Sequence, residues 1–482
     1  MTSIRKSLSS GIFYTALAKY SGVFISIFIG AILARLLTPK EFGIVALVSV
    51  FVSFFSLLSD FGIGQAVVQN QTLTEKDIHS IFSFSIILSL FLSGLFFFTA
   101  PFISAFYNEP ELINVSKLLS LSVLFNSLQV IPKALFQKAL KFKQIGIITV
   151  IIQVITGFIA IIMAFKGYSY YSLVFQSIIS GLCTLIIFYS LSPLRIVLKI
   201  EFNAIKKIIR FSSFNFLFNF INYFTRNGDN LLIGKFLGST SLGFYDKSYR
   251  LMMMPVLNLT HVITPVLMPV LSKYQDDKDV VYNSYLKVVK ILATIGFPLS
   301  VFLFFSSYEI VNIIYGSQWD QSIPVFKLIS ITIGIQIIYS SAGSVFQAIN
   351  RTDLLFYYGI IGAVILLSCI SCGIFWGKSI EAVGIGLIVA FSMNFFIVFY
   401  MLISLALKKS YLHFLNSIIY PVFISLFIAM PLWFYSMHAS VNLFLSLAIK
   451  IAITGLTFIL LFFYKKENRK ILQIGIKDYI KS

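Results

Sequence analysis

The sequence predicts an all-α integral membrane protein, and three observations lead to that prediction. The 482 residues are 58% hydrophobic and only 11% charged, and the mean hydropathy is +0.92. Apolar runs of about 20 residues, enough to cross a hydrocarbon core about 30 Å thick, recur from end to end. The chain has no series of alternating ten-residue segments, so a barrel is not indicated, and helices then satisfy the backbone groups in lipid.

The apolar runs predict about fourteen transmembrane helices. They begin near residues 11, 42, 80, 115, 145, 169, 211, 242, 286, 323, 355, 380, 413 and 442. The first run is too long for a cleaved signal peptide and lacks a small-x-small cleavage motif, so we expect it to remain as the first helix. Pro255, Pro265 and Pro269 interrupt the run from 242 and predict bends, which suit either a static kink or a hinge.

The distribution of basic residues predicts the orientation of the helices. The net charge of +19 comes from 37 Lys and Arg against 18 Asp and Glu. These basic residues fall mostly in alternate loops, as in 133–143, 195–210 and the tail from 465, rather than in one nucleic-acid-binding patch. This is the positive-inside pattern, and it places both termini in the cytoplasm, with contact to anionic lipids as a secondary use.

The sequence offers little that is typical of an enzyme. It has no Walker motif, no H-E-x-x-H and no credible Ser-His-Asp set, and no predicted outer loop is long enough for a catalytic domain. Cys183, Cys369 and Cys372 lie in apolar runs and are predicted to pack there. His261 is interpreted as a hydrogen-bonded structural residue. We therefore predict a transporter without a metal or nucleotide cofactor.

The stretch 211–275 carries polar side chains where hydrocarbon is expected. In its first half the polar residues recur at steps of 4, 3, 4 and 3, so they share one helical face: Asn215, Asn219, Asn222, Arg226 and Asp229. In its second half, which forms a second predicted helix, the same period relates Asp246, Arg250, Leu257, His261 and Thr264. Since a charge at mid-bilayer costs about 2.5 to 3.5 kcal/mol, we expect this stripe to face a wet cavity or a partner.

An internal repeat relates the two halves of the chain. Adding 200 to the polar positions of the first run, Thr15, Lys19, Gly22 and Ser26, gives Asn215, Asn219, Asn222 and Arg226. The match continues through Phe42-Gly43-Ile44 and Leu242-Gly243-Phe244. Each repeat covers six helices, so the halves cross the membrane in the same sense and are predicted to be related by a two-fold axis along the membrane normal.

The repeat also predicts the domain organisation. Residues 1–195 form an N-terminal six-helix lobe, 196–210 a basic cytoplasmic linker and 211–409 a second six-helix lobe. Residues 410–482 add two helices and a basic tail that have no counterpart in the first half. In repeat transporters the substrate site lies between the halves, so Lys19 and Arg226 are predicted to line one shared cavity.

Three acids have alternative interpretations. Asp60 lies beside the Gly62-Ile63-Gly64 break, where it would act as a cap or loop residue, and Asp229 and Asp246 lie one turn from a cation. All three are candidates for coupling transport to H⁺ or Na⁺. Their alternative role is local pairing and capping.

Several motifs resemble one bacterial family. Arg226-Asn-Gly-Asp-Asn-Leu-Leu-Ile-Gly-Lys-Phe-Leu-Gly, Leu242-Gly-Phe-Tyr-Asp-Lys-Ser-Tyr-Arg-Leu and Ala34-Arg-Leu-Leu-Thr-Pro-Lys-Glu-Phe-Gly are similar to the polysaccharide-transporter family of Wzx-type flippases and teichuronic or colanic acid exporters. That family belongs to the multidrug, oligosaccharidyl-lipid and polysaccharide exporter superfamily. The likeness extends over nearly the whole chain.

The resemblance implies a V-shaped, two-lobed, MATE-like bundle in the bacterial cytoplasmic membrane. It also implies movement of undecaprenyl-diphosphate-linked oligosaccharides between leaflets by alternating access, for O-antigen, capsule or exopolysaccharide synthesis. A diphosphate would suit Lys19, Arg226 and Arg250, and sugar hydroxyls would suit Asn215, Asn219 and Asn222. A polysaccharide polymerase and chain-length machinery would then be partners.

Two alternatives stay open. A multidrug antiporter of the same superfamily would share the fold, but we would expect acids to dominate a cavity for organic cations, and basic residues are at least as prominent here. A membrane polysaccharide polymerase or ligase would need a large outer loop, which the sequence does not indicate.

Overall fold

The computed structural model describes residues 20–70, 72–197, 200–438 and 441–464. Within helix α9 it leaves several side chains outside the description, among them those of Asn215, Asn222 and His261. Lys19 also lies outside the described residues. The chain divides into two compact units, Met1–Gly243 and Phe244–Ser482.

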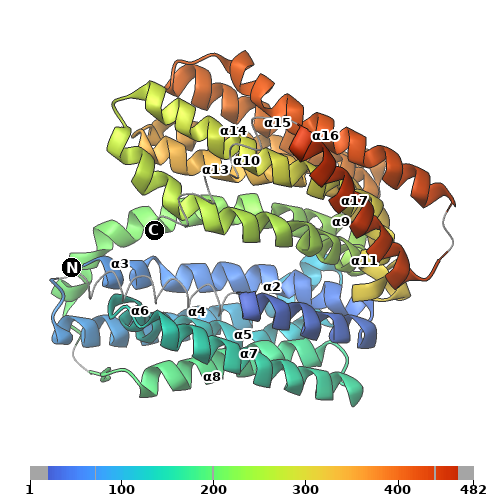
Figure 1. Cartoon of the computed structure of the whole chain (residues 1–482). Coiled ribbons are helices and arrows are strands. Elements are labelled where there is room, and N and C mark those ends of the chain that lie inside the picture. The colour runs from blue at the N-terminus through green and yellow to red at the C-terminus, as the bar shows by residue number, and fades with distance from the viewer. Residues whose placement is uncertain (1–19, 71, 198–199, 439–440, 465–482) are drawn as a thin grey trace. The chain divides into compact units, whose positions relative to one another are not determined.

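The described part of the chain is helical, which confirms the all-α prediction. The helices of the first unit are Tyr20–Leu36, α2 (Pro39–Asp60), α3 (Ile63–Gln69), α4 (Glu75–Tyr107), α5 (Leu112–Leu128), α6 (Val130–Lys138), α7 (Phe142–Phe165), α8 (Tyr171–Ser190) and the first part of α9 (Phe202–Leu271). Within this unit α5 packs against α2, α4 and α8, and α7 packs against α8 (Figure 1).

The second unit begins within α9. It continues as η1 (Ser272–Tyr274), α10 (Lys278–Phe305), α11 (Ser307–Ile314), η2 (Ser317–Trp319), α12 (Ser322–Ser330), α13 (Ile333–Ala348), α14 (Thr352–Cys372), η3 (Gly373–Gly377), α15 (Ile380–Tyr400), η4 (Met401–Ala406), α16 (Tyr411–His438) and α17 (Leu443–Tyr464). Helix α10 is central, since it packs against α12, α13, α16 and α17.

The helices have the length and surface of membrane spans. Among the described residues ten helices are long and apolar enough to cross a bilayer, or eleven if α12 and α13, bent by 57°, form one span. Large apolar side chains stand exposed on them, such as Phe98, Trp376 and Leu460. A soluble protein rarely exposes such surface, so the chain is a multi-pass membrane protein. The predicted count of fourteen spans stays a prediction.

Two helix breaks lie 200 positions apart. The first follows Leu36, where Thr38 caps α2: the Glu41 amide donates to Thr38 Oγ1 at 3.4 Å, and Thr38 Oγ1 donates to Glu41 Oε2 at 2.8 Å. The second lies at Gly238 in α9, whose φ of 86° and ψ of 170° are non-helical. A residue with a Cβ would be strained at that φ, so glycine permits the kink. The sequence repeat aligns these same positions.

Described residues in and next to the predicted linker 196–210 contact α4. The backbone amides of Arg195, Val197 and Glu201 donate to side chains on α4, those of His79, Ser83 and Ser80, at 3.3, 2.9 and 3.3 Å. Lys207 then pairs with the buried Asp77 at 2.7 Å. These bonds hold the segment that leads into α9, and its first turns, against α4.

Candidate functional site

The first part of α9 presents Arg226 as an exposed cation in an apolar helix. Gly238 ends this part twelve residues later, so Arg226 lies about 18 Å from the kink at 1.5 Å per residue. Among the residues that the structure describes, no acid forms an ion pair with Arg226. The guanidinium therefore keeps its fork of donors available to an anionic ligand.

Asp229 differs from Arg226 in its environment. Its side chain is buried, and its Oδ1 accepts from the amide of Asn230 at 2.8 Å. Asn227 turns back onto the helix and donates to the Tyr223 carbonyl at 2.9 Å, while Asn219 is half-buried. One helix thus carries an exposed cation and a buried acid within one turn.

In the second unit, α9 carries an ion pair on its polar face. Arg250 Nε donates to Asp246 Oδ2 at 2.7 Å, and the Arg250 side chain is 64% exposed against 14% for Asp246. Because the bond uses only Nε, the terminal nitrogens of the guanidinium remain available for other acceptors. Asp246 therefore orients Arg250 and leaves the terminal N–H groups of the guanidinium to donate to a ligand.

Lys247 is a buried cation that the helical periodicity of the polar residues does not indicate. Its side chain is only 6% exposed, and Nζ lies 5.0 Å from the ring centroid of Tyr315 and 5.6 Å from that of Trp319. Such cation–π contacts stabilise a desolvated ammonium. Lys247 lies off the stripe of 246 and 250, so periodicity did not reveal it. The signal available in the sequence was the aromatic pair Tyr315 and Trp319 in a short loop.

Reciprocal hydrogen bonds hold this part of α9 against α12. Ser248 Oγ donates to the Ser322 carbonyl at 2.8 Å, and Ser322 Oγ donates to the Phe244 carbonyl at 2.9 Å. Trp319 is fully buried beside them and meets the Phe244 ring edge-on at 5.9 Å. This packing fixes the helical phase that presents Arg250.

Asp60 occupies the position that the capping interpretation predicts. It is the last residue of α2, and its Oδ1 accepts from the amide of Gly64 at 3.2 Å across the turn at Phe61 and Gly62. In the described ranges no three or more His, Cys, Asp or Glu side chains gather as metal ligands. The role of Asp60 in coupling stays a prediction.

The fold and these faces define a class: a multi-pass helical membrane protein that carries cations on its helices. The chain resembles the solved lipid II flippase MurJ in an inward closed conformation, with a TM-score of 0.73, 15% identity and coverage of 97% of this chain and 99% of that one. It also resembles an inward-facing multidrug resistance MATE family transporter, with a TM-score of 0.64 and 14% identity over 82% of this chain and 99% of that one.

The family is shown by sequence. Residues 32–324, more than half of the chain, match the polysaccharide biosynthesis protein family, and the chain belongs to that family. It is 25% identical to the teichuronic acid biosynthesis protein TuaB of Bacillus subtilis over 98% of this chain and 99% of TuaB. It is also 25% identical to the lipopolysaccharide biosynthesis protein WzxC of Escherichia coli over 88% of this chain and 86% of WzxC. The predicted family is confirmed by the family match and by these relatives, and the likeness to MurJ and to the MATE transporter concerns the fold.

Proposed function

We propose that this protein moves undecaprenyl-diphosphate-linked oligosaccharide units across the bacterial cytoplasmic membrane by alternating access. The observation that carries the proposal is the exposed Arg226, far from the helix ends and without an acidic partner in the described structure, in a chain of a polysaccharide biosynthesis family. A diphosphate needs such bidentate cationic donors in a low-dielectric site.

The remaining residues of the proposed site follow from the same chemistry. Arg250, oriented by Asp246, is a second cation for the diphosphate, and Lys19, which the repeat aligns with Asn219, is a third. Asn215, Asn219 and Asn222 offer amide donors and acceptors to sugar hydroxyls. Asp60, Asp229 and Asp246 are the candidate acids for coupling to H⁺ or Na⁺.

The cellular setting belongs to the same proposal. The positive-inside pattern supports both termini in the cytoplasm. The chain would act as a transporter rather than an enzyme, and it would deliver units to a polysaccharide polymerase and chain-length machinery. A multidrug antiporter is less well supported, because the relatives in sequence are polysaccharide proteins and the MATE likeness concerns the fold.

Reconstitution tests the function directly. Vesicles holding the purified chain and a fluorescent undecaprenyl-diphosphate sugar are treated with an impermeant quencher. We expect the quenchable fraction to rise from about half toward completion as the lipid crosses the bilayer. Protein-free vesicles and vesicles with a labelled phospholipid are the controls. A rate equal to that of protein-free vesicles would contradict the proposal, and a rate unchanged by collapse of proton and sodium gradients would remove ion coupling.

A further inference from the structure

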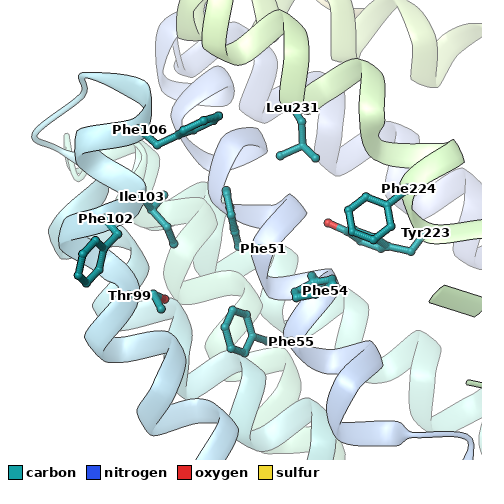
Figure 2. A pocket seen from close by; sticks show the side chains of 10 residues that line it. All are labelled: Phe51, Phe54, Phe55, Thr99, Phe102, Ile103, Phe106, Tyr223, Phe224 and Leu231. Carbon is teal, nitrogen blue, oxygen red and sulfur yellow. The ribbon is translucent and has the colours of Figure 1, made fainter. Parts of the chain in front are cut away.

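The first unit contains an apolar pocket that the proposed transport site does not use. Its volume is about 550 Å³, within the usual range of ligand pockets. Ten side chains from α2, α4 and α9 line it (Figure 2): Phe51, Phe54, Phe55, Thr99, Phe102, Ile103, Phe106, Tyr223, Phe224 and Leu231. Figure 2 shows the α4 side chains on one side of Phe51 and the α9 side chains on the other.

Among the described side chains that line the pocket, none offers a free hydrogen-bond donor. Thr99 Oγ1 donates to the Phe96 carbonyl at 2.8 Å, and Tyr223 Oη donates to the Val50 carbonyl at 2.6 Å. These are the two polar side chains among the described lining residues, and both hydroxyls donate to backbone carbonyls of their own unit. Water and sugars need polar partners, so neither suits this pocket, whereas a hydrocarbon chain does.

The pocket is accessible from the apolar surface of the unit. Phe102, Phe106 and Phe224 line it and are exposed. Two of the three helices that form it, α2 and α4, have the length and hydropathy of membrane spans. Its mouth therefore opens on the apolar surface of these helices, where we expect lipid chains to be the surrounding solvent.

A cation lies at one end of the pocket. Lys235 follows the lining residue Leu231 by one helical turn, and its Nζ lies 4.8 Å from the ring centroid of the lining residue Phe106. Nζ also donates to the Phe106 carbonyl, which occupies one of its three donors. The nearby acids Glu109 and Glu111 pair with Lys40 at 3.9 and 3.1 Å. Lys235 thus has donors for a phosphate at the level where α4 ends.

We propose that this pocket binds one phospholipid, with an acyl chain among the phenylalanines and its phosphate on Lys235. In the predicted topology the ends of α4 and of the first part of α9 face outward, so the lipid belongs to the outer leaflet. The lipid fills the gap between α2, α4 and α9 and holds the first part of α9, which carries Arg226, in its position. This site is separate from the proposed transport function.

Native mass spectrometry of the full chain tests the proposal. The protein is extracted in mild detergent from vesicles of phosphatidylethanolamine and phosphatidylglycerol at about three to one. We expect one phospholipid to stay bound. Phe102→Ala should lower its retention at least fivefold, since a phenylalanine contact in an apolar site is lost. Lys235→Gln should weaken retention roughly fivefold through loss of the phosphate contact.

Matched variants separate this site from general lipid contact. Phe98 is 73% exposed on the same helix, compared with 75% for Phe102, but does not line the pocket, and Lys117 sits over the Phe97 ring as Lys235 sits over Phe106. Phe98→Ala and Lys117→Gln should leave retention unchanged. A phospholipid with a photoreactive acyl chain should crosslink to α4 and α9 pocket residues in the unaltered chain. No retained phospholipid, equal loss in the control variants, or a polyprenyl phosphate in its place would overturn the proposal.

Discussion

Gly43 on α2 lies against the backbone of Ser239, just after the break in α9, and Gly243 on α9 lies against the backbone of Pro39, the first residue of α2. A Cβ on Gly43 would lie 1.8 Å from the Ser239 carbonyl oxygen, and a Cβ on Gly243 would lie 2.0 Å from the Pro39 carbonyl oxygen. Positions 39 and 239, like 43 and 243, differ by the 200 residues of the sequence repeat. These reciprocal contacts follow the 200-residue offset of the sequence repeat, and the two-fold arrangement of the repeats stays a prediction.

The close approach of α2 and α9 at Gly43 and Gly243 should not tolerate a side chain at either position. Gly43→Ala and Gly243→Ala each place a methyl group on a backbone oxygen that cannot rotate away, so we expect a loss of about 1–3 kcal/mol in stability. Gly94→Ala is the matched control, because a Cβ there would meet nothing within 4 Å. Thermal unfolding of the detergent-solubilised variants measures the difference, and equal melting temperatures for all three would contradict the close approach.

Trp319 should be a principal anchor of the second unit. It is fully buried and contacts the Lys247 ammonium and the ring of Phe244, so Trp319→Ala should cost about 3–5 kcal/mol. Trp376 is 82% exposed, and Trp376→Ala should change stability by no more than about 0.5 kcal/mol. Unfolding midpoints of the two variants in the same detergent test this contrast. Similar midpoints would mean that Trp319 does not hold α9.

Lys450 on α17 and Glu309 on α11 form a buried ion pair of 2.5 Å, and Ser446 also donates to Glu309 Oε1 at 2.7 Å. Removing one partner leaves a buried charge uncompensated, so Lys450→Met should destabilise the protein by about 3–5 kcal/mol. The double variant Lys450→Met, Glu309→Leu should recover much of that loss. Unfolding measurements in a double-mutant cycle give the coupling free energy between the two side chains. Additive losses of stability would mean that the two side chains are not energetically coupled.

Arg226 should matter for transport rather than for folding. Because it is exposed and has no acidic partner among the described residues, Arg226→Ala should leave the amount of folded protein near normal while polymer export falls. Arg226→Lys should keep partial activity, since the charge survives without the bidentate fork. Abundance and surface polysaccharide are measured in the same cells. Normal export by well-expressed Arg226→Ala would reject the site, and rescue of low abundance by adding Asp229→Ala would indicate a structural pair.

The predicted orientation can be tested with single cysteines in a chain whose three native cysteines are replaced. Cysteines at Lys141 and Lys206 should react with an impermeant maleimide only after the membrane is permeabilised. Cysteines at Asn108 and Ser317 should react in intact cells. Labelling of position 206 in intact cells would be incompatible with both termini in the cytoplasm.

The sequence alone determined the class of this protein, because the length and hydropathy of each apolar run are local properties that decide whether the run can span a bilayer. It also determined the family motifs and the helical phase that places Arg226 and Arg250 on polar faces. For Asp60 the sequence indicated a cap or loop role beside the Gly62-Ile63-Gly64 break, and the structure shows its carboxylate accepting a hydrogen bond from the Gly64 amide.

Only the tertiary structure decided which side chains from distant segments meet. The burial of Lys247 depends on Tyr315 and Trp319, which lie about 70 residues away, and the pair of Lys450 and Glu309 joins helices 141 positions apart. The aromatic pocket draws its walls from α2, α4 and α9. In the sequence these residues are indistinguishable from the other phenylalanines of apolar spans, because helical periodicity defines a face but not the helix that will cover it.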